Sequence, residues 1–252
     1  FWVVGHFLNE SLGWRETLVV FAAINLAVCL PLNWFGLARR EPADIAPPRE
    51  DPARAKEGPP LEGPARTLAM ILFALVMSLN AFVFGVISVQ LVPLLEGAGL
   101  ATAAAVWVAS MKGFAQFAGR VVELVFGRRL HAMTVARIAI GVLPVSFALL
   151  WLGHGRLALI VAFTLLTGAS QGVVTIVRGA VPLALFGPKG YGAVLGILAT
   201  PILLVTSASP TVFALIVDAF GWRTAEIVLI AASAASCIAM EIMTRWYERR
   251  RG

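Results

Sequence analysis

Long uninterrupted apolar runs are the feature that most limits how this chain can fold. A helix needs about 20 residues to cross the roughly 30 Å hydrocarbon core of a bilayer. Runs of that length predict seven spans, at residues 16–37, 67–92, 103–126, 132–152, 157–177, 191–217 and 224–245. Residues 1–8 are interpreted as the tail of a preceding span. Because the runs are apolar on all sides and do not alternate, they predict helices and not the strands of a barrel.

Composition supports lipid as the main solvent of this chain. Hydrophobic residues make up 59% of it and charged residues 13%, against roughly 45–50% and about 25% in soluble domains. The fold class is therefore predicted to be an all-α polytopic membrane protein whose first partner is the bilayer. The net charge of +6 does not suggest nucleic acid, because the basic residues lie at the ends of apolar runs and form no continuous patch. The two cysteines and three histidines show no metal-ligand spacing.

Residues 39–66 form the one long hydrophilic segment and contain seven of the fourteen prolines. Such a segment cannot bury a core, so it is predicted to be a solvated linker. If the linker is cytoplasmic, fourteen Lys and Arg residues near span ends or in loops lie inside and only Arg15, Arg156 and Arg223 lie outside. Because cytoplasmic loops carry the excess of basic residues, this asymmetry places the linker and the C-terminus in the cytoplasm.

An internal repeat relates the first predicted span to the last. Gly13-Trp14-Arg15 recurs as Gly221-Trp222-Arg223, an offset of 208 residues. The same offset pairs Val20 with Val228, Ala23 with Ala231, Ala27 with Ala235 and Cys29 with Cys237. Six spans separate the copies, so the first span is interpreted as the last helix of one six-helix repeat and the others as the complete second repeat. Two parallel six-helix halves joined by a hydrophilic linker are the plan of one large class of transporters.

Two local motifs strengthen this interpretation. One consists of Gly119-Arg120, Glu123 and Gly127-Arg128-Arg129, and the other of the segments 175–179, 185–187 and 191–192. The first resembles the cytoplasmic loop signature of the major facilitator superfamily, although it has Glu where Asp is more usual and one extra residue before Gly-Arg-Arg. The second resembles the region of helices 10 and 11 in monocarboxylate-porter-like bacterial members of that superfamily.

The resemblance implies a numbering and a cellular setting. Residues 1–38 would hold the end of helix 5 and helix 6, residues 39–66 the cytoplasmic linker, residues 67–246 helices 7 to 12, and residues 247–252 a basic cytoplasmic tail. The chain is thus interpreted as a fragment that begins inside a membrane segment, so that most of helices 1–5, the N-terminal half, is missing. The implied location is a bacterial inner membrane, and the implied activity is proton-coupled alternating access for a small solute.

Lys112 is the sharpest single signal, because a charge near the middle of a span costs at least about 2.5 kcal/mol and commonly faces a cavity or a partner. Gln116, Arg120 and Glu123 follow it along one stripe of the same predicted helix. Lys112 is therefore a candidate ligand for a substrate anion. The alternatives are a snorkelling lysine and a member of a structural ion pair.

The other candidates fall into two groups, each with a structural alternative. Asn80, Gln116, Gln171 and Arg178 are candidate substrate-binding residues, although Asn80 and Gln171 could equally join helices and Arg178 could be a snorkelling anchor. The resemblance makes Arg120, Glu123, Arg128 and Arg129 a candidate cytoplasmic gate. For Arg128 and Arg129, ordinary positive-inside anchoring is an equal alternative. The glycine pairs Gly168/Gly172 and Gly192/Gly196 are expected to permit close helix packing.

No motif of an enzyme or of a cofactor site is present in the sequence, so no catalytic residue, metal or cofactor is predicted. Secondary transport of an organic anion is the function that these features favour. Proton-driven efflux of a drug or metabolite is the first alternative, and a membrane receptor or scaffold that transports nothing is the second. A channel is less favoured, because the sequence contains no filter-like segment or ring of charge.

The predicted orientation can be tested with reporters that are active only in the cytoplasm. Fusion after Gly63 or at Gly252 should give an active reporter, whereas fusion after Gly153 should not, because basic residues retain the first two sites inside. Reporter activity normalised to expression is the measurement. Equal activity at Gly153 and Gly252 would refute the orientation.

Overall fold

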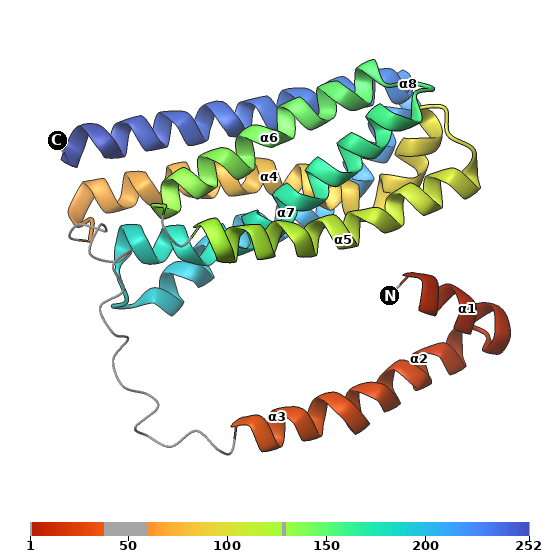
Figure 1. The fold of residues 1–252 in the computed structure, drawn as a ribbon. Coiled ribbons are helices and arrows are strands. Elements are labelled where there is room, and N and C mark those ends of the chain that lie inside the picture. Colours follow the sequence, from red (N-terminus) through yellow and green to blue (C-terminus); the bar gives the residue numbers. More distant parts are fainter. Residues whose placement is uncertain (1, 38–59, 128–129, 252) are drawn as a thin grey trace. The chain divides into compact units, whose positions relative to one another are not determined.

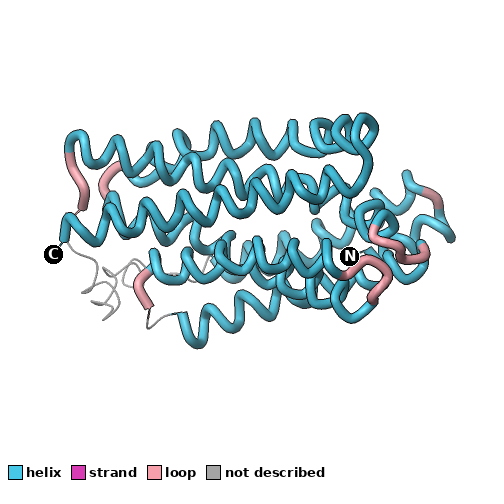
Figure 2. Tube along the Cα trace, turned by 90° about the horizontal axis from the view of Figure 1, so that it is seen from above, coloured by secondary structure: helices cyan, strands magenta, loops and turns pink. Residues whose placement is uncertain are grey.

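The computed structural model describes residues 2–37, 60–127 and 130–251. The chain divides into two compact units, residues 1–52 and residues 53–252, which are considered separately below. Helices make up nearly all of the described residues, and no strand occurs among them (Figure 2). The prediction of an all-helical chain is confirmed.

The first unit is a pair of helices joined at one glycine. α1 spans Trp2–Leu12, and α2 spans Trp14–Ile24. α2 continues through a π-helical turn, Asn25–Cys29, into α3, Leu30–Leu37. Gly13, which lies between α1 and α2, has φ 84° and ψ 167°. A Cβ at Gly5 would lie 3.8 Å from the Phe21 ring, so α1 and α2 fold back on each other.

The second unit contains five continuous helical elements. They are α4 (Gly63–Gly97), α5 (Thr102–Phe126), α6 (Ala132–Leu152), α7 (Leu157–Phe186) and α8 (Tyr191–Arg251). α4 begins four residues before the expected start of the span, inside the predicted linker, whose residues 39–59 lie outside the described ranges. α7 runs nine residues beyond its predicted end at residue 177.

α8 is two helical segments, because Gly221 has the non-helical angles φ 79° and ψ 168°. Both segments, residues 191–220 and 222–251, run alongside α4. Gly85 of α4 lies against Ser209 of the first segment, and Asn80 contacts Ser236 of the second. Trp222 packs on Gly97 at the end of α4. The chain therefore reverses direction at Gly221, as the course of the blue ribbon in Figure 1 shows.

The helical segments of the second unit run alternately in opposite directions (Figure 1). The beginning of α4, the ends of α5 and α7 and the C-terminus lie together, and we call this the C-terminal end. A backbone hydrogen bond from Leu61 to Leu185 joins two chain segments there. The connections 98–101 and 153–156 lie at the other end with Gly221, which we call the Gly221 end. The backbone N–H of Gly155 donates to the carbonyl oxygen of Ala98 there.

Two apolar clusters fill this bundle. One lies among α4, α6, α7 and α8 and contains Phe73, Met77, Ile140 and Met240. The other includes Leu94, Phe163, Phe213 and Leu229 and extends to the Gly221 end. The bundle surface is also apolar: the side chains of Trp107 and Phe114 are 78% and 79% exposed. A surface of this kind is suited to lipid or to further protein.

Among the described residues, five helices are long and apolar enough to cross a membrane, by length and composition. They are Trp14–Gly36, α4, α6, α7 and α8, the last counted through Gly221. α5 is long enough, but polar side chains such as Lys112 and Gln116 lower its hydropathy. The prediction of a membrane-embedded helical protein is thus supported by five of these elements.

α5 and α7 approach each other through glycines. A Cβ on Gly168 would lie 2.7 Å from the Lys112 carbonyl oxygen, and one on Gly172 would lie 2.2 Å from the Gln116 carbonyl oxygen. From the other side, a Cβ on Gly119 would lie 2.4 Å from the Ala169 carbonyl oxygen. The expected packing role of Gly168 and Gly172 is confirmed. In contrast, a Cβ built on Gly192 or Gly196 would meet no other described segment within 4 Å, so the packing role expected of this pair is wrong for the described residues.

This difference gives a matched pair of substitutions. Gly172→Ala should destabilise the protein by about 1–3 kcal/mol, because the methyl group would collide with backbone that can move only if the helices separate. Gly196→Ala is the control and should be neutral or stabilising by up to about 1 kcal/mol, since alanine favours a helix. The midpoint of thermal unfolding in detergent measures both. A Gly172→Ala midpoint equal to that of Gly196→Ala would contradict the close α5–α7 contact.

Candidate functional site

The register between α5 and α7 brings predicted site residues together. The two helices run in the same direction, with Lys112 opposite Gly168 and Gln116 opposite Gly172. Farther along, Nη2 of Arg120 donates to Oγ1 of Thr175 at 3.3 Å. Gln171 and Arg178 each come three residues after a residue of this contact line, Gly168 and Thr175, so they lie on the same side of α7. We call the resulting group the polar seam; it consists of Lys112, Gln116, Arg120, Gln171, Thr175 and Arg178.

Lys112 lies near the middle of its helix, ten residues after Thr102 and fourteen before Phe126. Its side chain is half-buried. In the described ranges it takes part in no hydrogen bond or ion pair. The structural ion pair, one of the alternatives for this residue, therefore has no candidate among the described acids.

Three cations of the polar seam lack an acidic partner. The ion pairs between described residues do not include Lys112, Arg120 or Arg178. Two buried polar atoms of the seam, Nε of Arg178 and Oε1 of Gln171, also have no hydrogen-bond partner. The seam thus offers mainly donors, which suit carboxylate, phosphate or other acceptor-rich groups.

Asn80 lies elsewhere. Its side chain is completely buried on α4. Nδ2 donates to the Val76 carbonyl oxygen at 2.9 Å and to Oγ of Ser236 on α8. Ser236 also donates to the Val76 carbonyl oxygen, at 3.2 Å. This geometry corresponds to the interhelical alternative for Asn80, and the residue is not part of the polar seam.

The predicted gate is described only in part. Arg120 is exposed and Glu123 is half-buried near the end of α5. The Glu123 carboxylate lies 3.0 Å from the position of a Cβ on Gly127, so it folds back toward the end of its own helix. Arg128 and Arg129 lie outside the described residues, and the contacts of a complete gate therefore stay a prediction.

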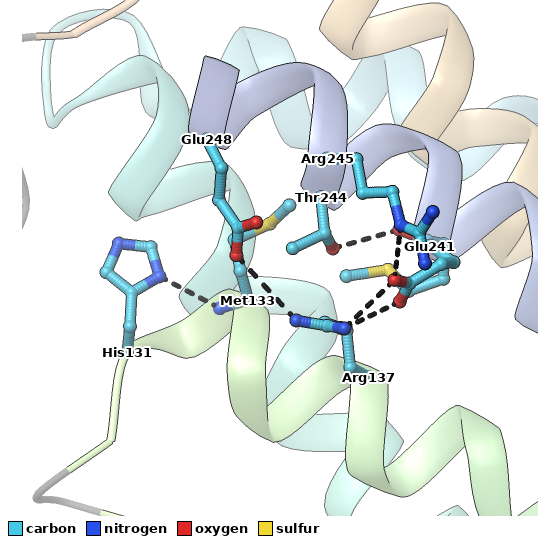
Figure 3. A network of polar contacts seen from close by, with 8 residues as sticks. His131, Met133, Arg137, Glu241, Thr244, Arg245 and Glu248 are labelled. Atoms are coloured by element: carbon cyan, nitrogen blue, oxygen red, sulfur yellow. Dashed lines mark hydrogen bonds and ion pairs between the residues drawn. The ribbon is translucent and has the colours of Figure 1, made fainter. Parts of the chain in front are cut away.

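Sequence reasoning missed two sets of contacts that involve acidic side chains. In the first, Arg137 of α6 forms ion pairs with Glu241 and Glu248 of α8, at 2.8 and 3.7 Å, and Arg245 also binds Glu241 (Figure 3). In the second, Nε2 of His154 lies 2.9 Å from both carboxylate oxygens of Glu226. Only the Glu241–Arg245 pair has a local signal, the i,i+4 spacing on one helix. The other partners are far apart in sequence.

The described residues bring no three His, Cys, Asp or Glu side chains close enough together to hold a metal ion. Comparisons with protein-family models, curated proteins and solved structures gave no match to this chain. The chemistry of the polar seam therefore carries the functional interpretation.

The contact between Asn80 and Ser236 can be tested by changing each residue alone and both together. Asn80→Leu should destabilise the protein by about 0.5–2 kcal/mol, the range for an interhelical hydrogen bond in a membrane bundle. Ser236→Ala should cost a similar amount. The double variant should cost less than the sum, because both changes remove one contact. Thermal unfolding midpoints in detergent provide the comparison, and strictly additive losses would argue against the contact.

Proposed function

We propose that this chain is part of a secondary transporter of the major facilitator type, which moves a small organic anion by proton-coupled alternating access. In this proposal the chain supplies helices 6 to 12, and the polar seam is its share of the substrate pathway. The observation that carries the proposal is a group of three cations along one seam of the bundle that form no ion pair with a described acid.

The backbone at the repeated Gly-Trp-Arg motif supports two related halves. Gly13 and Gly221 have nearly the same angles, φ 84° and ψ 167° against φ 79° and ψ 168°. Each glycine joins two helices that fold back on each other. The repeat therefore extends from sequence to local structure, as expected for duplicated six-helix units.

The helix count of the proposal follows from α5 and α8. α8 counts as two spans because the chain reverses at Gly221. α5 counts as a span because its 25 residues reach about 37 Å at 1.5 Å per residue. With α4, α6 and α7 this gives six spans in residues 53–252. The segment Trp14–Gly36 is the seventh.

A substrate role for Lys112 is favoured over its alternatives. Snorkelling would require the ammonium to reach a helix end at least ten residues away, about 15 Å along the axis, which is longer than its four-carbon stem. Structural pairing has no described acid to use. An anion bound from the pathway would provide the missing charge. We assign Gln116 and Gln171 to hydrogen bonding of the same solute, at neighbouring levels of α5 and α7.

The remaining parts of the proposal concern the C-terminal end of the bundle. Arg120 and Arg178 lie nearer that end than Lys112 does, so they would meet an anion on its way to or from it. We place this end in the cytoplasm of a bacterial cell, on the strength of the Lys and Arg distribution. Arg120, Glu123, Arg128 and Arg129 then form the cytoplasmic gate.

The test uses the full-length protein in vesicles and measures the initial rate of uptake of radiolabelled lactate, benzoate and succinate driven by a pH gradient. Lys112→Ala should abolish uptake of the anion that the wild type transports, while the amount of folded protein stays near normal. Lys112→Arg should slow uptake without abolishing it, since the charge is kept but a planar fork replaces a compact ammonium.

Lys189→Ala is the matched control, because Lys189 lies in the connection between α7 and α8 and outside the polar seam. It should transport at the wild-type rate. Near wild-type uptake by Lys112→Ala would end the substrate-binding role of Lys112. Loss of folded protein in that variant would point instead to a structural ion pair.

A further inference from the structure

Glu226 is the only charged residue that is buried among the residues the structure describes, with 1% of its side chain exposed. It belongs to the first turns of the segment 222–251. Its neighbours in sequence, Ala225 and Leu229, are completely buried in the apolar cluster at the Gly221 end. A carboxylate in such surroundings is unfavourable unless a charged or hydrogen-bonding partner replaces the water it has lost.

His154 is that partner and comes from a different part of the chain. It lies in the connection between α6 and α7, 72 residues before Glu226. Its Nε2 is 2.9 Å from Oε1 and 2.9 Å from Oε2. When Glu226 is ionised its carboxylate can only accept hydrogen bonds, and Nε2 of His154 is then the donor to both oxygens. The contact holds the 153–156 connection against α8.

The same connection is tied to the end of α4. The N–H of Gly155 donates to the carbonyl oxygen of Ala98 at 2.9 Å. On the neighbouring turn, Trp222 fills the space over Gly97, where a Cβ would lie 2.7 Å from its ring. The 98–101 connection, the 153–156 connection and the start of the segment 222–251 thus meet within a few residues of Glu226.

The other charged side chains of this end lie at its surface, and of these Arg223 acts on the Glu226 carboxylate through its charge without forming an ion pair. Glu96, Arg156, Asp218 and Arg223 are all exposed. None of the four forms an ion pair with a described residue. Arg223 lies over the Trp151 ring, 5.5 Å from its centroid. Among the described residues of this end, the His154–Glu226 contact is therefore the one hydrogen-bonded side-chain pair that involves a buried acid.

We propose that His154 and Glu226 form a latch that joins the connections of the Gly221 end into one rigid body and keeps water out of the apolar cluster beneath them. This latch goes beyond the proposed transport function and does not depend on the identity of any solute. Removing either partner should release the 153–156 connection, because no other described side chain of this end forms a hydrogen bond or ion pair with the remaining group.

The test measures whether a buried atom beneath the latch becomes accessible. Ala98, which is completely buried, is replaced by cysteine in a chain whose native Cys29 and Cys237 are changed to alanine. The rate of labelling by a membrane-impermeant maleimide is measured for the purified protein in detergent. The cysteine should react slowly in this background and at least about tenfold faster with His154→Ala or Glu226→Gln added, as expected for local opening.

Two further variants make the outcome decisive. Arg137→Ala breaks ion pairs at the C-terminal end and should leave the labelling rate unchanged. Exchange of the partners, His154→Glu with Glu226→His, should restore slow labelling, because it recreates the contact with the groups reversed. If a single variant fails to fold, recovery of folded and slowly labelled protein by the exchange still supports the latch. Labelling of His154→Ala within twofold of the background rate, or fast labelling in Arg137→Ala alone, would overturn it.

Discussion

The need to satisfy every backbone N–H and C=O group within the chain governs the rest of this structure. Hydrocarbon offers these groups no hydrogen-bond partner, so a spanning segment has to be helical. Buried hydroxyls follow the same rule by binding the carbonyl oxygen one turn earlier, as Thr164 does with Ile160 and Thr244 with Met240. The interior of the second unit can therefore contain polar atoms without needing water.

Against this background the polar seam combines unsatisfied groups with positive charge. Buried polar residues such as Ser146 and Ser170 have partners in the bundle, whereas Lys112 has none among the described residues and Arg178 has a buried N–H without an acceptor. The glycines that bring α5 and α7 together also let Arg120 reach Thr175 across the pair. The same pair of helices thus packs closely and carries hydrogen-bond donors without acceptors. A ligand site built on rigid elements is expected to have this arrangement.

The sequence predicted most of the helices, because a membrane span can be recognised from the length of one continuous apolar run. The predicted bounds of the span at 132–152 agree with α6, and those at 103–126 agree with α5 to within a residue. The predicted end of α7 was too early because Arg178 and Pro182 interrupt the apolar run, whereas the helix in the bundle continues through both to Phe186. Contacts between segments that are distant in sequence produce no comparable local pattern. Neither the His154–Glu226 contact nor the burial of Asn80 against Ser236 could be read from spacing, since both depend on which helix faces overlap after folding.

The corner at Gly221 has a consequence for how this chain can change in evolution. A connection of several residues, such as 98–101, can gain or lose a residue and leave its flanking helices in place. A turn made by one glycine cannot accommodate such a change in length without moving its flanking helices. Inserting a single residue between Gly221 and Ser236, or between Ser209 and Gly221, would turn that arm by about 100° about its own axis and carry its contact with α4 out of reach. The lengths of the two helical segments on either side of Gly221 are therefore constrained. Substitutions in this helical hairpin are tolerated far more readily than insertions or deletions.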